Sequence, residues 1–227
     1  MHCHVVPGVD DGCPDAAASV EVCGQMAEMG LKRIIASPHV TGTTFENTVQ
    51  TLTPAFSRLQ EALKGAGMEG LVTDFGAENR LDDLFKKNFD GDTLISHPNH
   101  VILIENPFIQ EPWNLEQIIF DLQLKGYQPV MAHPERFAYY VLNPGKLKKL
   151  HDKVPFQVNV LSLAGHYGKH VRKMAESLID ARMVDFLGTD FHNTGHTAAV
   201  RDYLATRTAA RDARALSGKL LNDRIFR

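Results

Sequence analysis

The sequence predicts an α/β fold in which parallel strands and helices alternate around a barrel. Short apolar runs rich in β-branched residues alternate with amphipathic, helix-forming stretches along the chain, a pattern typical of a parallel sheet with helical crossovers. Polar side chains of metal-binding types follow nearly every apolar run, and only a ring of strands brings all of them to one place. An open, doubly wound sheet has the same periodicity, so this convergence is what favours the barrel.

The individual elements are predicted from their apolar runs and their end signals. The first helix begins at a capping aspartate, Asp15, and ends at Gly30. The β-rich run "LKRIIAS" follows it and ends at Pro38, because proline stops ladder pairing. A further strand is implied before His2. The remaining expectations are strands at about 33–37, 71–75, 101–105, 128–132, 156–160 and 184–188, and helices at about 15–29, 49–64, 113–125 and 168–181, with a last helical stretch over much of 197–221.

Composition indicates one soluble globular domain spanning residues 1–227, with 44% hydrophobic and 22% charged residues. A formal net charge of −3 provides no basic field for nucleic acid or anionic lipid. The absence of a 20-residue apolar run and of a secretory signal leads us to expect a cytoplasmic protein without direct membrane insertion. The three cysteines form no CxxC pair, so we expect reduced thiols at Cys3, Cys13 and Cys23.

The strand ends present a mixed set of imidazoles and carboxylates. Residues i and i+2 of an extended segment face the same side, so His2 with His4, and Asp190 with His192, each direct two groups at one centre. Such ligands without thiolate suit manganese, iron or zinc. One ion uses about four to six ligands, so the surplus predicts a multinuclear hydrolytic site. The set comprises His2, His4, Asp10, Asp11, His39, Glu78, Glu105, His133, Asp190 and His192.

A cation accompanies this set. In "AHPER", Arg136 follows His133 by three residues, and a guanidinium there is able to hold a phosphate through two hydrogen bonds. An arginine beside these residues favours a phosphate ester over a neutral amide as the substrate. It does not require a phosphate ester, because arginine also binds carboxylates.

Each of these residues taken singly has a structural interpretation. An isolated HxH is more often solvated or core histidine than a metal pair, "DDG" is usually a turn, and a lone glutamate is usually a surface charge. Their shared position at strand ends is what favours ligation. His166 and His196 also follow strand ends and are candidate substrate contacts. The other polar or aromatic residues are expected to be solvated, at His97, His100, His151 and His170, or to pack, at Trp113, Tyr139 and Tyr140.

With these residues identified, the sequence resembles the PHP (polymerase and histidinol phosphatase) superfamily, and within it the bacterial tyrosine phosphatases of capsule and exopolysaccharide loci, of the CpsB and YwqE type. The resemblance rests on "HCHVVPGVDDG", "ASPHV", "GAE", "LIE", "AHPER", "SLAGHYG" and "GTDFH", which cover nearly the whole chain in order. It implies a distorted (β/α)7 barrel with three divalent ions, manganese foremost and iron or zinc as alternatives. The implied ligands are His2, His4, Glu78 and Asp190 for the first ion, Glu78, Glu105 and His133 for the second, and Asp11, His39 and His192 for the third.

The resemblance also implies a mechanism. A metal-bound hydroxide attacks phosphorus in line while the ions and Arg136 stabilise the phosphoryl oxygens. Asp10 is expected to hydrogen-bond a ligand or the nucleophilic water, and Cys3 to point into packing. The chain departs from the family in two places. Only Met1 precedes His2, so we expect a first strand that is truncated or missing, and no arginine follows "GTDFH", so His196 or Arg201 is a candidate for the second phosphate contact.

Three functions fit these observations. The first is a metal-dependent protein-tyrosine phosphatase that acts on a bacterial tyrosine autokinase controlling capsule or exopolysaccharide synthesis. The second is a PHP phosphatase for a small molecule such as histidinol phosphate, and the third is a catalytically impaired regulatory protein. The sequence leaves the oligomeric state open.

Overall fold

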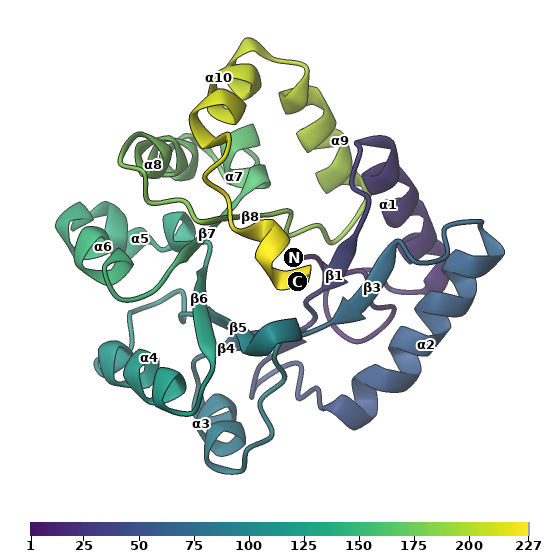
Figure 1. Cartoon of the computed structure of the whole chain (residues 1–227), viewed down its shortest axis with the longest axis horizontal. Coiled ribbons are helices and arrows are strands. Elements are labelled where there is room, and N and C mark those ends of the chain that lie inside the picture. Colours follow the sequence, from purple (N-terminus) through teal and green to yellow (C-terminus); the bar gives the residue numbers. More distant parts are fainter. Residues whose placement is uncertain (227) are drawn as a thin grey trace.

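The computed structural model describes residues 1–226, and its strands form a curled parallel sheet with helices around the outside (Figure 1). Six strands hydrogen-bond in the order β2-β4-β5-β6-β7-β8, all parallel, while β1 and β3 pair with each other. This confirms the predicted α/β fold with parallel strands around a barrel, and the six-stranded sheet curls as a half-barrel with β2 and β8 at its edges. The strands are β1 (Ile34–Ala36), β2 (His39–Val40), β3 (Val72–Phe75), β4 (Glu78–Arg80), β5 (Val101–Glu105), β6 (Gln128–Ala132), β7 (Phe156–Asn159) and β8 (Phe186–Gly188).

Helices follow most of the strands and cover the outer face of the sheet (Figure 1). The last helical stretch, expected as one, is two helices that meet at residues 205–206. No helix within residues 1–226 has the length and apolar character needed to cross a membrane. The α-helices are α1 (Ala16–Glu28), α2 (Val49–Gly65), α3 (Asp83–Asp90), α4 (Leu115–Leu124), α5 (Ala138–Val141), α6 (Pro144–His151), α7 (Val160–Ala164), α8 (Lys169–Asp180), α9 (Thr194–Leu204) and α10 (Arg207–Leu216), and the 3-10 helices are η1 (Pro98–His100), η2 (Pro134–Arg136) and η3 (Asn222–Phe226).

Residues 2–4 lie between the two edges of the curled sheet. The His4 N–H donates to the carbonyl of Phe191 at 2.9 Å, beyond the end of β8. On the other side the Ser37 N–H, beyond β1, donates to the carbonyl of Cys3 at 2.8 Å. The segment that carries the HxH motif therefore has the hydrogen-bonding neighbours of a strand, although it is not a regular strand itself.

Two short strands were not predicted, and both carry candidate ligands. His39 was expected just beyond a strand but lies within β2, and Glu78 begins β4. The two residues are direct register partners across this pair of strands. Strands of two and three residues have no apolar run of their own, so periodicity does not show them.

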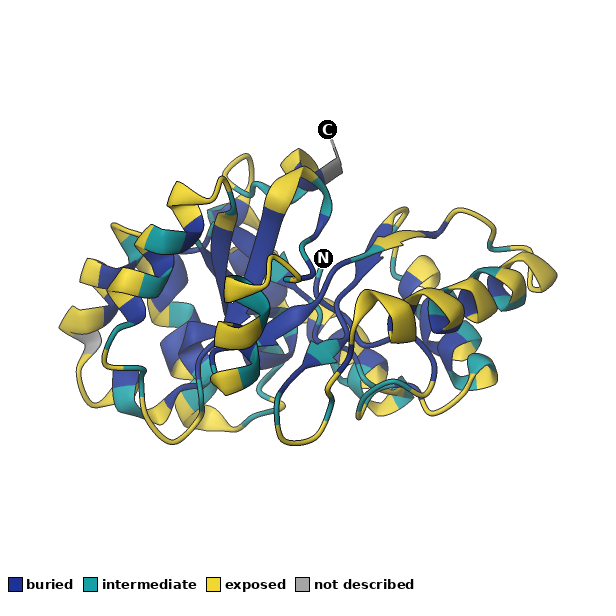
Figure 2. Ribbon diagram, turned by 90° about the horizontal axis from the view of Figure 1, so that it is seen from below, coloured by how far each residue is buried: buried dark blue, intermediate teal, exposed yellow. Residues whose placement is uncertain are grey.

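The core lies between the sheet and the helices, and the strands are buried while the helices expose their outer faces (Figure 2). All five residues of β5 are buried, as expected for a parallel strand covered on both faces. Cys3 is buried, which confirms that it points into packing. Two expectations are wrong: the side chain of Trp113 is 96% exposed and does not pack, and His97 is buried, with its Nε2 2.8 Å from the Ser37 hydroxyl.

Candidate metal centre

The predicted metal-binding residues converge at the carboxyl ends of the strands. They come from the N-terminal segment, the loop before α1 and five strands that are far apart in sequence: two residues begin β2 and β4, which follow β1 and β3, and the others end or follow β5, β6 and β8. Their ligand atoms form adjoining groups whose members lie within 4.8 Å of one another. These groups are His2, His4, Glu78 and Asp190; His4, Asp11, His39 and His192; and His39, Glu78 and Glu105.

The first group has the dimensions of a metal cage. His2 Nε2 lies 3.2 Å from Glu78 Oε2 and 3.3 Å from Asp190 Oδ1. His4 Nε2 lies 3.4 Å and 3.3 Å from the same two oxygens. A tetrahedral ion with bonds of about 2.0–2.1 Å separates its ligands by about 3.3–3.4 Å, so these four atoms are spaced like the corners around one ion.

The atoms that face this cage lack other partners. Among the described residues, His2 Nε2, His4 Nε2, His39 Nδ1 and Glu78 Oε2 are buried without a hydrogen bond. A buried polar atom without a partner costs about 1–3 kcal/mol, so four of them in one place require a common partner. Divalent cations held in these adjoining groups would satisfy such atoms, so the donor set fits metal.

Glu78 lies between the groups and can bridge them. Its Oε2 faces His2, His4 and also His39 Nδ1, at 3.1 Å. Its Oε1 lies 2.8 Å from His133 Nε2, which in turn lies 3.6 Å from Glu105 Oε1. The two oxygens of one carboxylate therefore face two different sets of ligands.

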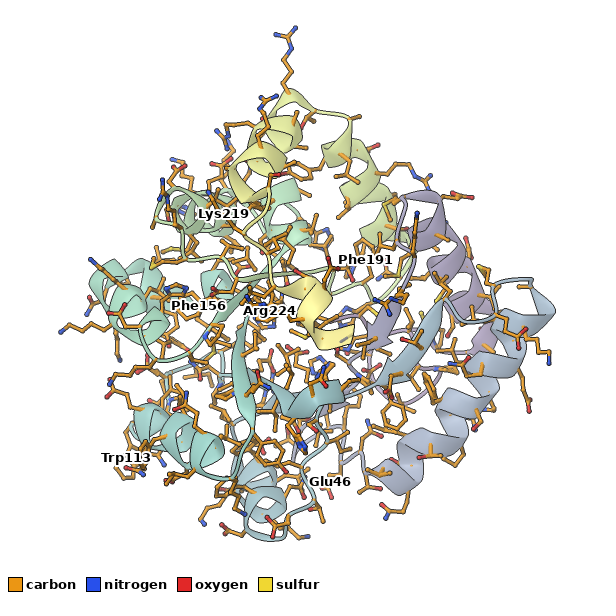
Figure 3. The ribbon with its side chains drawn as sticks, viewed as in Figure 1. Glu46, Trp113, Phe156, Phe191, Lys219 and Arg224 are labelled. Carbon is orange, nitrogen blue, oxygen red and sulfur yellow. The ribbon has the colours of Figure 1, made fainter. Side chains whose placement is uncertain are left out.

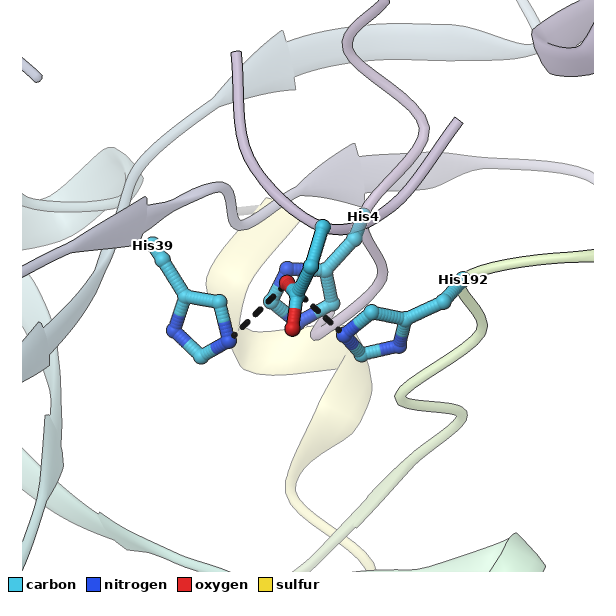
Figure 4. Close-up of side chains that lie close together, drawn as sticks. His4, His39 and His192 are labelled. Carbon is cyan, nitrogen blue, oxygen red and sulfur yellow. Dashed lines mark ion pairs between the residues drawn. The ribbon is translucent and has the colours of Figure 1, made fainter. Parts of the chain in front are cut away.

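Asp11, His39 and His192 form a second group together with His4, and Figure 4 shows the three imidazole rings close together. The Nε2 atoms of His39 and His192 lie 3.6 Å and 3.4 Å from Asp11 Oδ1. The Asp11 side chain is 58% exposed, whereas those of His39 and His192 are only 12% and 15% exposed. This group is the most open of the three and faces solvent.

Hydrogen bonds to the outer nitrogen orient three of the imidazoles. The Nδ1 atom of His2 donates to Gln157 Oε1 at 2.5 Å, and that of His192 donates to the Asp190 carbonyl at 2.9 Å. His4 Nδ1 donates to Asp10 Oδ2 at 2.8 Å. A proton on Nδ1 leaves the lone pair on Nε2, which is the nitrogen that faces the cage.

Asp10 belongs to this outer layer. Its Oδ2 also accepts the His39 N–H at 3.0 Å, and its Oδ1 accepts the Gly12 N–H at 3.0 Å. Of the two roles expected for Asp10, its geometry fits hydrogen bonding to a ligand, because its oxygens are occupied by these donors.

The backbone at three candidate ligands adopts the left-handed region that side chains disfavour. The φ angles are 73° at His2, 30° at His133 and 54° at Asp190. Such conformations cost about 1–3 kcal/mol each and persist only where the surroundings impose them. Close approach imposes another constraint, because a Cβ on Gly12 would overlap the His4 carbonyl.

The buried charges shift the titration of the centre. Burial opposes protonation of His2, but Glu78 and Asp190 outweigh it and raise its pKa to about 10. Burial lowers the pKa of His39 to about 4 despite Glu78. Burial and Glu78 raise the pKa of Glu105 to about 8. In the metal-free protein, protons on His2 thus supply part of the positive charge that the carboxylates require.

Arg136 lies beside the cage and is tied to it. Its Nη1 donates to Asp190 Oδ2 at 2.8 Å, and the same oxygen accepts the hydroxyl of Tyr167 at 2.9 Å and the amide of Asn159 at 2.6 Å. The guanidinium lies 4.2 Å from the centre of the Tyr167 ring and 5.1 Å from that of Phe108. Its side chain remains 22% exposed, so Arg136 is held at the edge of the metal groups and within reach of a ligand.

The other predicted contacts divide into two sets. His196 lies 5.5 Å from His192, and His166 lies 4.6 Å from His196, between ring centres, so both border the open group. Burial, His192 and His166 lower the pKa of His196 to about 4. Arg201 instead points from α9 to Glu28 on α1, at 3.3 Å, which removes it as a second phosphate contact.

Sequence reasoning missed Arg80 and Phe108 at this site. Arg80 Nε donates to Glu105 Oε2 at 3.1 Å, and its guanidinium lies 5.9 Å from the Phe108 ring, which Arg136 approaches as well. The only sequence signal is position, since Arg80 follows Glu78 by two residues and Phe108 follows Glu105 by three.

Comparison with known proteins identifies the relationships of the chain. The CpsB/CapC family, described as acting in capsular polysaccharide synthesis, matches residues 1–214. The tyrosine-protein phosphatase YwqE of Bacillus subtilis (strain 168) is 35% identical over 195 residues, covering 85% of this chain and 76% of the relative. The tyrosine-protein phosphatase CpsB of Streptococcus pneumoniae is 24% identical over 231 residues, covering 95% and 93%.

A solved structure agrees with these relationships. It is described among the crystal structures of YwqE from B. subtilis and CpsB from S. pneumoniae, unique metal-dependent tyrosine phosphatases. It superposes with a TM-score of 0.80 at 30% identity, covering 94% of this chain and 90% of that chain.

Proposed function

The chain belongs to the CpsB/CapC family of capsular polysaccharide synthesis and is a metal-dependent tyrosine-protein phosphatase, and on this premise we propose its substrate and the roles of its residues. The substrate is phosphotyrosine on a protein, with a bacterial tyrosine autokinase that controls capsule or exopolysaccharide synthesis as the partner, acting in the cytoplasm. The observation that carries the proposal is the cage of unpartnered ligand atoms with an arginine at its edge.

We propose three divalent ions, manganese foremost and iron or zinc as alternatives. Bound ions of this kind polarise phosphoryl oxygens and supply a water nucleophile at neutral pH. Glu78 is the proposed bridge because its two oxygens face different imidazoles. The ligand sets are His2, His4, Glu78 and Asp190; Glu78, Glu105 and His133; and Asp11, His39 and His192.

Arg136 holds the phosphate in this proposal, and Arg80 is the second cation beside it. Both guanidinium groups lie over the Phe108 ring, at 5.1 Å and 5.9 Å from its centre, and both are partly exposed. An anion placed between the arginines and the metal groups would be stabilised from two sides as charge gathers on its oxygens. Asp10 keeps His4 in position, and His166 and His196, which lie beside His192, are proposed as further substrate contacts.

Aromatic side chains around the site support a tyrosyl substrate over a small aliphatic phosphate. The Phe108 ring stacks near His133 with centres 6.1 Å apart, and the Phe45 ring stacks near His39 at 5.9 Å with an interplanar angle of 9°. Tyr167 lies against Arg136. Each aromatic pair contributes about 0.5–1.5 kcal/mol. The phenyl ring of a phosphotyrosine should therefore gain more binding energy from these side chains than the smaller imidazole ring of histidinol phosphate.

The test measures metal content and turnover together. The proposal predicts close to three ions per chain, hydrolysis of p-nitrophenyl phosphate that chelation abolishes, and a higher kcat/KM for a phosphotyrosine peptide than for histidinol phosphate. Preference for histidinol phosphate would favour the small-molecule alternative, and a metal-poor protein without turnover would favour a regulatory role. The substitution Arg80→Ala should weaken competitive inhibition by inorganic phosphate, whereas Arg201→Ala, a surface arginine on α9, should leave it unchanged.

A further inference from the structure

A groove of about 970 Å³ runs between α3 and α4, beside the metal centre. Its floor includes Leu81, Phe85 and Ile118, which are buried or half-buried. Its rim includes Ile109 and Trp113, whose side chains are 93% and 96% exposed. Figure 3 shows Trp113 at the outer edge of the molecule beside α4. Large apolar side chains so fully exposed in one place indicate a surface that another molecule covers.

The groove starts where the metal centre ends. Arg80, the last residue of β4, contacts Glu105, the last residue of β5. The segments that follow these two strands each line one wall of the groove. Leu81 follows Arg80 directly into the groove, and Pro107 enters it two residues after Glu105. A molecule held at the arginines therefore has a continuous path into the groove.

Phe108 separates the two sites. Its side chain lies near His133 and Arg136 on the side of the metal centre, while its neighbours Pro107 and Ile109 line the groove. A phosphotyrosyl ring beside Phe108 would place the adjoining peptide backbone over this loop.

The groove carries excess negative charge. The acidic lining residues are Asp82, Asp83 and Asp90 on the α3 side and Asp121 on α4. Lys86 is the only cation among the described lining residues, and Asp90 pairs with it at 2.6 Å. Asp82 is engaged by backbone N–H groups as the N-cap of α3. Among the residues that the structure describes, Asp83 and Asp121, one on each wall, have no ion-pair partner within 4.0 Å.

We propose that this groove binds the peptide segment flanking the phosphotyrosine and selects an apolar side chain next to a lysine or arginine. The inference rests on the proposed function, because it names the substrate sequence of the same site. Exposed Ile109 and Trp113 cover the apolar side chain, and Asp83 and Asp121 attract the cation. Asp83 follows Arg80 by three residues, so their Cα atoms lie no more than about 11 Å apart, which an extended peptide covers in about three to four residues. The cation therefore lies within about four residues of the phosphotyrosine.

The kinetic test compares matched phosphotyrosine peptides. One peptide carries leucine and lysine within four residues of the phosphotyrosine, the other carries leucine and glutamate, and each is made with the pair on either side. The lysine peptide should have a kcat/KM about tenfold higher in at least one orientation, mainly through KM, and the preference should shrink as salt rises. The double substitution Asp83→Asn with Asp121→Asn should reduce the preference to about twofold or less. Asp202→Asn, an exposed carboxylate on α9, should retain it.

A binding test uses the protein's single tryptophan. Because Trp113 is the only tryptophan in the chain and lines the groove, peptide binding should shift its fluorescence to shorter wavelength. The lysine peptide should shift the emission at lower concentration than the glutamate peptide.

The outcomes separate this inference from the proposed function. Equal kcat/KM for both peptides, or an emission unchanged at saturating peptide, would overturn the groove while leaving the phosphatase intact. A double variant that loses turnover equally for both peptides and for p-nitrophenyl phosphate would also overturn it. Failure to hydrolyse any phosphotyrosine peptide would overturn both proposals.

Discussion

The substitution Asp10→Asn tests whether this carboxylate positions His4 or takes part in proton transfer. The two carboxylate oxygens accept three hydrogen bonds, from His4 Nδ1, the His39 N–H and the Gly12 N–H, at 2.8, 3.0 and 3.0 Å. Asparagine keeps one of these oxygens and replaces the other with an NH₂ group, which then faces a donor. An unsatisfied buried donor costs about 1–3 kcal/mol, equivalent to roughly 5- to 150-fold in metal affinity. Loss of an outer-layer partner of a metal-bound histidine typically costs about 10- to 100-fold.

The assay titrates metal against a competing chelator and then measures p-nitrophenyl phosphate turnover at saturating metal. A positioning role predicts weaker metal binding and a kcat that recovers to within about threefold once the ions are loaded. Asp202→Asn serves as the matched control, because it removes an exposed carboxylate on α9. A variant with full metal content and a kcat that stays low, with one limb of the pH profile missing, would refute the positioning role and assign proton transfer to Asp10.

Three further predictions concern the phosphate, pH and packing. Arg136→Ala should lower kcat/KM for p-nitrophenyl phosphate about 10²- to 10³-fold with little change in metal content, and proportional loss of both would make its role structural. The pKa of His2 in the folded, metal-free protein is about 10, above its ordinary 6.5. Protonated His2 therefore stabilises the metal-free fold fully below about pH 6.5, and this stabilisation is lost as the pH rises through 10. The melting temperature with chelator should fall across that interval, and a rise would contradict the shift. Gly12→Ala should lower the free energy of unfolding by about 1–3 kcal/mol in chemical denaturation, because the added Cβ would meet the His4 backbone. Gly65→Ala is the control, since nothing lies within 4 Å of a Cβ there, and it should be neutral or stabilising in the same experiment.

The sequence anticipated which residues meet at the site, because their position after apolar runs follows from a general property of parallel sheets. It did not anticipate the local backbone. The spacing of His2 and His4 suggested a regular strand, but His2 has a φ of 73°. The segment around His2 is positioned by hydrogen bonds to residues far away in the sequence. Likewise, the pairing of His39 with Glu78 depends on two short strands that no periodic pattern marks.

Exposure was also beyond what the sequence could show. Trp113 is large and apolar, as core residues usually are. Its side chain lies outside the core only because of the position of α4 relative to α3. His97 reads as a polar residue in a loop, yet it is buried against Ser37. For Arg80 the sequence offered only its position two residues after Glu78, because its contact with Glu105 joins two neighbouring strands. Each of these outcomes is set by tertiary packing.

Asp190 couples the metal groups to the phosphate-binding arginine. Its Oδ1 lies 3.3 Å from the Nε2 atoms of both His2 and His4, while its Oδ2 accepts Arg136 and Tyr167. Without metal, Arg136 is one of the cations that balance this buried carboxylate. An ion bound at Oδ1 would take over part of that balance, weakening the attraction between Asp190 and Arg136 and leaving the guanidinium better able to pair with an incoming phosphate. Metal loading should therefore tighten phosphate binding in wild-type protein by more than it does in Arg136→Ala, and equal tightening in both would show that the ions act on phosphate without this arginine.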